Sequence, residues 1–164
     1  MLAMVAEGNV VIEHPNRDKP ESQATRAIVV GLLLVSAALL VIASVGGWSK
    51  IQGAKPVQLA YILIYLLLAF YIARWRSGLL PVAASFAIIL LIFCAISGPQ
   101  WFTRDRAGFE DPLLDESIVG ILTLVLVPLQ VLLIIVAARG FSQKWSVEVE
   151  RRPDGVAPYA APSR

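Results

Sequence analysis

The chain has 164 residues, of which 57% are hydrophobic and 16% charged, and its formal net charge is +2. Soluble domains carry about 25% charged residues, so this composition excludes an ordinary soluble domain. The small net charge and the lack of a basic run longer than Arg151-Arg152 give no reason to expect a nucleic-acid partner.

A single cysteine, Cys94, and a single histidine, His14, restrict the chemistry that the chain can support. They exclude an internal disulfide, a thiolate metal site and a haem held by two histidines. The sequence also contains no phosphate-binding glycine loop and no grouping of nucleophile, base and metal ligands. We therefore expect no cofactor, no metal and no enzymatic activity.

Four stretches without a charged side chain organise the chain, at 27–49, 56–73, 77–103 and 117–138. Roughly 20 helical residues cross the hydrocarbon core of a bilayer. The fold class predicted is therefore all-α, an integral membrane four-helix bundle. Its spans are expected at about Ala27–Trp48, Pro56–Trp75, Leu79–Ser97 and Ser117–Ala138. These bounds predict an N-terminal tail over 1–26, a transmembrane domain over 27–138, and a C-terminal tail over 139–164 that is flexible after about 152.

The N-terminal tail distinguishes the first span from a signal peptide. A signal peptide begins with a short basic segment, whereas this tail is long and carries the acids Glu7, Glu13, Asp18 and Glu21. The first span is therefore expected to remain as a membrane anchor. Within the tail, the segment 9–13 has the β-branched composition that is typical of a strand.

Polar side chains form one face of the second span and of the fourth. Gln58, Tyr61 and Tyr65 are spaced three and four residues apart, and Thr123 and Gln130 are also aligned. Polar groups in hydrocarbon seek hydrogen-bond partners, so we expect this polar seam to fasten the bundle. The alternative is that these faces line a polar cavity, although transport paths usually also contain an ionisable residue within the membrane.

Prolines and a short turn predict local geometry. The turn between the second and third spans is tight, which favours an antiparallel hairpin of those two helices. Pro56 and Pro81 fall in the first turns of their helices, where the missing N–H costs little. Pro128 lies in the middle of the fourth span and removes the bond to the Leu124 carbonyl, so a helix kink is expected there.

The loop at 98–116 is rich in acidic residues, namely Asp105, Glu110, Asp111, Asp115 and Glu116. Calcium prefers several oxygen ligands, but the regular spacing of an EF-hand loop is absent. We expect Asp115 and Ser117 to cap the fourth helix, because its N-terminal dipole favours acids.

The segment 145–150 in the C-terminal tail alternates apolar and acidic residues, which is the period of a strand. The two tails lie on the same side of a four-span protein, so these segments could pair with each other. Two strands alone are marginal in water, and joining a partner's sheet edge would stabilise them, with Val147 and Val149 as candidate partner contacts. A helical continuation followed by disorder is the alternative.

Aromatic and basic residues predict how the chain is threaded. A tryptophan stands at or near the C-terminal end of each run, where its ring suits the headgroup level; these interfacial anchors are Trp48, Trp75, Trp101 and Trp145. Ten of the 14 lysine and arginine residues belong to the two tails and the second turn. This bias predicts a multi-pass protein of the cell membrane with both termini in the cytoplasm.

The chain resembles small tetraspanning accessory membrane proteins of actinobacteria, such as the accessory subunit of mycobacterial Mce lipid importers. The resemblance lies in the four-span form and in the character of the segments 45–48, 98–102 and 145–151. It implies a role beside a lipid-translocating permease, and no functional residue is carried over with it.

Three classes of function remain to be compared. The missing chemistry disfavours an enzyme, and the missing intramembrane charge disfavours a proton- or ion-coupled carrier. We therefore expect a non-catalytic accessory or scaffold subunit of a larger membrane complex, in contact with membrane lipids and with a permease-like partner. The alternative is a small oligomeric carrier or channel, with a path lined by the seam of Gln58, Tyr61, Tyr65, Thr123 and Gln130.

Overall fold

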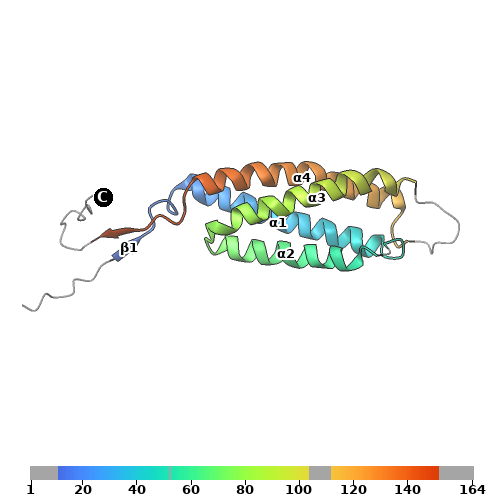
Figure 1. Ribbon diagram of the computed structural model, residues 1–164, viewed down its shortest axis with the longest axis horizontal. Helices are drawn as coiled ribbons and strands as arrows, with labels where there is room; N and C mark the ends of the chain where they lie inside the picture. Colours follow the sequence, from blue (N-terminus) through green and yellow to red (C-terminus); the bar gives the residue numbers. More distant parts are fainter. Residues whose placement is uncertain (1–10, 52, 104–111, 152–164) are drawn as a thin grey trace, which may run out of the picture.

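The computed structural model describes residues 11–51, 53–103 and 112–151 (Figure 1). Four helices in these ranges are long and apolar enough to cross a membrane. In chain order the elements are β1 (Val11–Glu13), α1 (Pro20–Gly46), α2 (Lys55–Ala73), the 3-10 helix η1 (Ser77–Leu79), α3 (Leu80–Trp101), α4 (Glu116–Ser142) and β2 (Val149–Arg151). The prediction of an all-α fold is confirmed, and each predicted span corresponds to a helix that is long and apolar enough to cross a membrane.

Three helices extend beyond the predicted spans, and α4 ends at Ser142, four residues past its predicted end at Ala138. Helix α1 begins at Pro20, inside the segment predicted as a tail, and Ser22 and Thr25 in this extension are buried against the bundle. Helix α3 continues through Pro99 to Trp101, where a loop was predicted from Gly98. Gly98 lies close against Leu124 of α4, so the packing between these helices continues past the predicted end. The charge-free runs in the sequence located the apolar part of each helix but did not show where each helix begins or ends.

The helix termini follow the expected chemistry. Pro56 and Pro81 lie in the first turns of α2 and α3, as predicted. The Asp115 carboxylate accepts a hydrogen bond of 2.8 Å from the backbone N–H of Ser117, which confirms Asp115 as the cap. That bond lowers the pKa of the Asp115 carboxyl below its ordinary value. Ser117 lies inside α4 and supplies the capped N–H rather than a second cap. Helix α4 runs through Pro128 without a break, and the kink there remains a prediction.

The helices do not pack in the order that the short turn suggested. Helix α1 packs against both α2 and α4, and α3 packs mainly against α4. Helix α3 starts beside the end of α2 but diverges from it toward α4 (Figure 1). The predicted antiparallel hairpin of the second and third helices is therefore wrong as a packing unit. A tight turn fixes where two helices meet, but their buried faces decide which partners they follow.

The two tails meet at one end of the bundle (Figure 1). Strands β1 and β2 pair antiparallel, with Ile12 opposite Glu150 and Glu13 opposite Val149. Helix α4 continues to Ser142 before the chain turns into β2. Of the two alternatives for the tails, the pairing of strands is the one present in the structure. The turn between α1 and α2, the end of α3 and the start of α4 lie at the opposite end (Figure 1).

Candidate functional site: a polar tie and a cleft

A chain of hydrogen bonds joins three helices in the middle of the bundle. The Tyr65 hydroxyl donates to Gln130 Oε1 at 2.8 Å, and Gln130 Nε2 donates to Ser36 Oγ at 3.0 Å. All three residues are fully buried. We call this set the polar tie. It connects α2 and α4 to α1, and both ends of the Gln130 amide have a partner within it.

Tyr65 and Gln130 were predicted from the sequence, whereas Ser36 was missed. A small hydroxyl residue inside an apolar run carries little signal alone, because serine is common in membrane helices. The available signal was its position: Ser36 follows Val29 and Leu33 at helical spacing, and all three belong to the buried face of α1. A polar residue on a buried helical face implies a polar neighbour on another helix.

The polar tie is expected to contribute modestly to stability. Combining Tyr65→Phe with Gln130→Leu in a double-mutant cycle should give a coupling free energy of about 0.6 kcal/mol, with about 1.7 kcal/mol as the upper end for such bonds in membranes. Reversible unfolding in mixed micelles would measure it. The exposed hydroxyl of Ser85, which bonds to its own helix at the Pro81 carbonyl, gives a control: pairing Ser85→Ala with Gln130→Leu should show strict additivity. Strict additivity for Tyr65 and Gln130 as well would contradict the tie.

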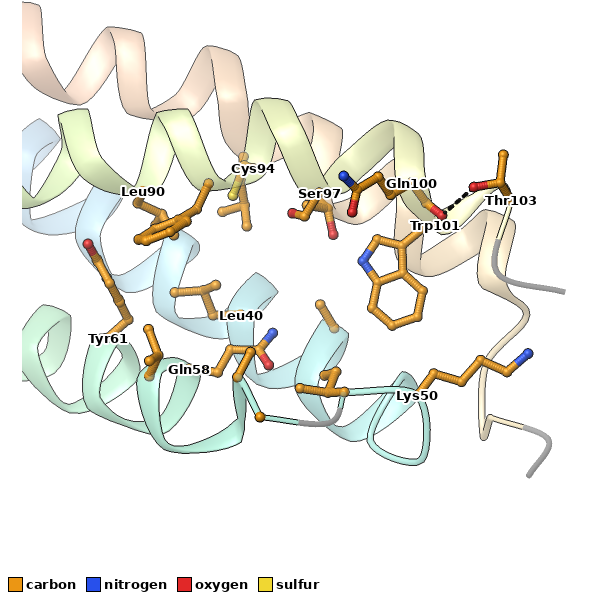
Figure 2. A pocket seen from close by; sticks show the side chains of 18 residues that line it. Leu40, Lys50, Gln58, Tyr61, Leu90, Cys94, Ser97, Gln100, Trp101 and Thr103 are labelled. Atoms are coloured by element: carbon orange, nitrogen blue, oxygen red, sulfur yellow. Dashed lines mark hydrogen bonds between the residues drawn. The ribbon is translucent and has the colours of Figure 1, made fainter. Parts of the chain in front are cut away.

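A cleft of about 710 Å³ lies between α2 and α3 at the end away from the tails. Figure 2 shows side chains from both helices pointing into it. Its inner part is lined by Leu40 and Leu90, and Leu126 of α4 also belongs to the lining. At the innermost point, the Tyr61 ring packs edge-on against Phe86 of α3, with ring centroids 5.9 Å apart. This contact joins α2 to α3 and closes the cleft on the side of the tails.

The mouth of the cleft is polar. Ser97, Gln100 and Thr103 line it from α3 and the residues that follow. Lys50, from the turn after α1, forms an ion pair with Glu116 at the start of α4. In the sequence, Lys50 is simply the first charged residue after an apolar run. Nothing there indicates that its charge meets that of Glu116 across the loops.

The structure divides the predicted polar seam between two places. Tyr65 and Gln130 belong to the polar tie, whereas Gln58, Tyr61 and Thr123 line the cleft. Thr123 donates to the Val119 carbonyl of its own helix at 2.8 Å. Gln58 is different, because its side-chain oxygen is buried and has no hydrogen-bond partner among the described residues.

The four tryptophans differ in their surroundings. Trp48 is 42% exposed and has the Lys55 ammonium 4.7 Å from its ring centroid. Trp101 and Trp145 are buried within the protein. Trp75 packs edge-on against Trp145, with ring centroids 5.4 Å apart. The placement of all four at the headgroup level remains a prediction; for Trp101 and Trp145 the structure adds a packing role inside the bundle.

No group of three or more His, Cys, Asp or Glu side chains is gathered as a metal site in the described part of the chain. Of the acidic loop considered for calcium, Asp105, Glu110 and Asp111 lie outside the described residues. No protein family, curated protein or solved structure matches this chain. The four helices, each long and apolar enough to cross a membrane, place the chain in the class of four-helix, multi-pass membrane proteins.

Proposed function

We propose that this protein is a non-catalytic accessory subunit of a larger membrane complex in the cell membrane, with both tails in the cytoplasm. The resemblance described above adds a lipid importer of the Mce type as the particular partner. The observation that carries the proposal is the small sheet that the two tails form at one end of the bundle.

This tail sheet is incomplete by itself. Its strands are three residues each, and no third strand joins them within the described ranges. Ile12, Val147 and Val149 expose their apolar side chains around it. Two-stranded sheets are marginal in water, and an added strand supplies both backbone hydrogen bonds and apolar contacts. A partner's sheet edge is therefore the binding mode that this end of the molecule suits best.

The tail sheet is also held firmly on the bundle. The Asn16 side-chain amide donates to the Lys144 carbonyl at 3.0 Å, and Arg17 Nε donates to the Trp145 carbonyl at 3.2 Å. These bonds cross-link the two tails between the strands and the bundle, after β1 ends and before β2 begins. A surface that is already ordered loses less conformational entropy when it binds, which favours use of the tails for docking.

The carrier alternative finds some support in the cleft, whose lining includes Gln58, Tyr61 and Thr123. A path through the bundle would also have to pass the polar tie, which is fully buried and fully bonded. Opening it would leave polar groups without partners in an apolar interior. The tie therefore favours the accessory role over a carrier.

Purification of the tagged protein from its native membranes in mild detergent tests the proposal. A permease or an ATPase should co-elute in stoichiometric amount. Val147→Asp places a charge in the expected contact and should reduce that co-elution by at least about tenfold. Ser146→Asp adds the same charge at the neighbouring exposed position and should reduce it far less. Recovery of the chain alone as a stable homo-oligomer would overturn the proposal and favour a carrier.

The orientation can be tested separately by labelling single cysteines in intact cells. In a Cys94→Ser background, a membrane-impermeant maleimide should label Gly53→Cys, in the turn after α1, and should leave Ser146→Cys unlabelled. The reason is the excess of basic residues at the tail end, which is retained on the cytoplasmic side. Permeabilised cells, in which Ser146→Cys must react, are the control. The reverse labelling pattern would place the tails outside.

A further inference from the structure

The cleft has an apolar interior and a polar mouth, which is the arrangement that an amphiphilic molecule matches. Leu40 and Leu90 lie inside, and Ser97 and Gln100 lie nearer the mouth. The lining of α3 from Leu90 to Gln100 extends about 15 Å at the helical rise of about 1.5 Å per residue. The volume of about 710 Å³ falls within the range of about 300–1,000 Å³ that is usual for small-molecule sites.

The cleft narrows too far to admit a helix of a partner protein along its length. A helix with side chains is about 10–12 Å in diameter, whereas the rings of Tyr61 and Phe86 close the inner end with their centroids 5.9 Å apart. An extended hydrocarbon chain is much thinner, and the bilayer surrounding α2 and α3 supplies such chains wherever the two helices diverge.

The polar groups indicate which head group fits. The buried oxygen of Gln58 has no hydrogen-bond partner among the described residues, and a buried acceptor of this kind is costly unless a donor reaches it. Lys50 is the one ionised residue among the described residues that line the cleft, and Glu116 already neutralises it. The site therefore offers a place for a hydroxyl donor and no net charge to attract an anion.

We propose that the cleft between α2 and α3 binds a neutral, hydroxyl-bearing, single-chain amphiphile, of which a monoacylglycerol is the simplest example. The hydrocarbon chain lies between Leu40 and Leu90 and ends at the contact of Tyr61 with Phe86. A hydroxyl of the head group donates to the Gln58 side chain. The site is formed by this chain alone, so it does not depend on the proposed partner complex.

Photolabelling of the purified full-length protein in phosphatidylcholine nanodiscs tests the proposal. The probe is a monoacylglycerol with a diazirine in its acyl chain, and mass spectrometry locates the label. We expect saturable labelling of the cleft-facing residues of α2 and α3. Unlabelled monoacylglycerol should compete, and the fatty acid of the same chain length should not.

Three variants sharpen the test. Ser97→Phe fills the cleft and should abolish the labelling, whereas Ile96→Phe places the same ring on the outer face of α3, where Ile96 is 59% exposed, and should leave it unchanged. Gln58→Leu adds no bulk and should weaken competition by monoacylglycerol about five- to tenfold, as expected for one lost hydrogen bond. Thermal unfolding of each variant verifies that it is folded. If Ser97→Phe does not fold, the test of the site rests on Gln58→Leu.

Several results would overturn the proposal. Labelling spread evenly over the lipid-facing surfaces would mean that the cleft holds no selected ligand. Competition by monoacylglycerol that is as strong in Gln58→Leu as in the unchanged protein would mean the same. Stronger competition by the fatty acid would exclude a neutral head group. A protein crosslinked in native membranes to a photoreactive amino acid at position 97 would show that a partner protein occupies the cleft instead.

Discussion

Replacing Trp145 with alanine is expected to destabilise the bundle by about 3–5 kcal/mol, the usual cost of truncating a buried tryptophan. Trp145 is the largest fully buried side chain described, with 0% exposure. Its ring packs against Trp75 and lies 3.2 Å from the position that a Cβ on Gly140 would take. Its indole N–H donates to Gln143 Oε1 at 2.9 Å, and Gln143 in turn donates to Thr25 at 3.1 Å. Removing the ring therefore loosens α4, the turn after α2 and the start of α1 together.

Unfolding in mixed micelles would measure this loss, and limited proteolysis would show whether the C-terminal tail is released first. Trp48→Ala is the matched control, because Trp48 is 42% exposed and its truncation should cost less than about 1 kcal/mol. Equal losses for the two variants would mean that the tail end of the bundle contributes nothing particular to stability. Resistance of the C-terminal tail to protease in the Trp145→Ala variant would show that the tail sheet is held by its hydrogen bonds alone.

Much of the fold could be predicted because a membrane allows few solutions. A backbone in hydrocarbon must satisfy its polar groups internally, so each apolar run of sufficient length is expected to be a helix. The ends of the helices were harder to predict. Pro20 and Ser22 lie in a polar segment without an apolar run, yet they continue α1, because helical hydrogen bonding does not stop where hydrophobicity does.

Packing was less predictable than secondary structure. The spacing of Tyr65 along the second span and of Gln130 along the fourth singled out two residues that belong to the polar tie, but spacing along one helix does not show which other helix supplies a partner. Ser36 therefore went unnoticed. The cleft depends on how far α3 diverges from α2 along their lengths, and this follows from how closely α3 fits against α4. Such a fit depends on many small contacts at once and leaves no local pattern in the sequence.

The ion pair of Lys50 with Glu116 is a second contact that no local pattern in the sequence predicts. Lys50 directly follows the apolar run 27–49 and Glu116 directly precedes the run 117–138, so each alone is an ordinary flanking charge. Their contact arises because the backbone N–H of Leu114 bonds to the Gly46 carbonyl at 3.0 Å, which draws the start of α4 to the end of α1. A glycine at position 46 allows this approach, since a Cβ there would lie 2.5 Å from the Leu114 side chain.

Gly47→Val is expected to destabilise the end of the bundle opposite the tails by about 1–3 kcal/mol, as overpacking of a dense core does. A Cβ on Gly47 would lie 2.6 Å from the Trp101 ring. That ring cannot move away easily, because Trp101 is 4% exposed and packs in a cluster with Ala43, Ile51 and Val119. On α4, a Cβ on Gly120 would come 3.1 Å from Trp101 Cβ, so this tryptophan is enclosed by the ends of two helices that need glycine there.

The measurement is the midpoint of thermal unfolding in detergent, compared with Gly53→Val. Position 53 is also a non-helical glycine at this end of the bundle, and no atom lies within 4 Å of a Cβ built there, so the control carries the same change in backbone entropy without the clash. Trp101 lines the cleft, and its displacement in the Gly47→Val variant should also reshape the mouth and reduce labelling by the monoacylglycerol probe. Equal midpoints for the two variants would show that Trp101 can repack, and the close contact at Gly47 would then have no structural consequence.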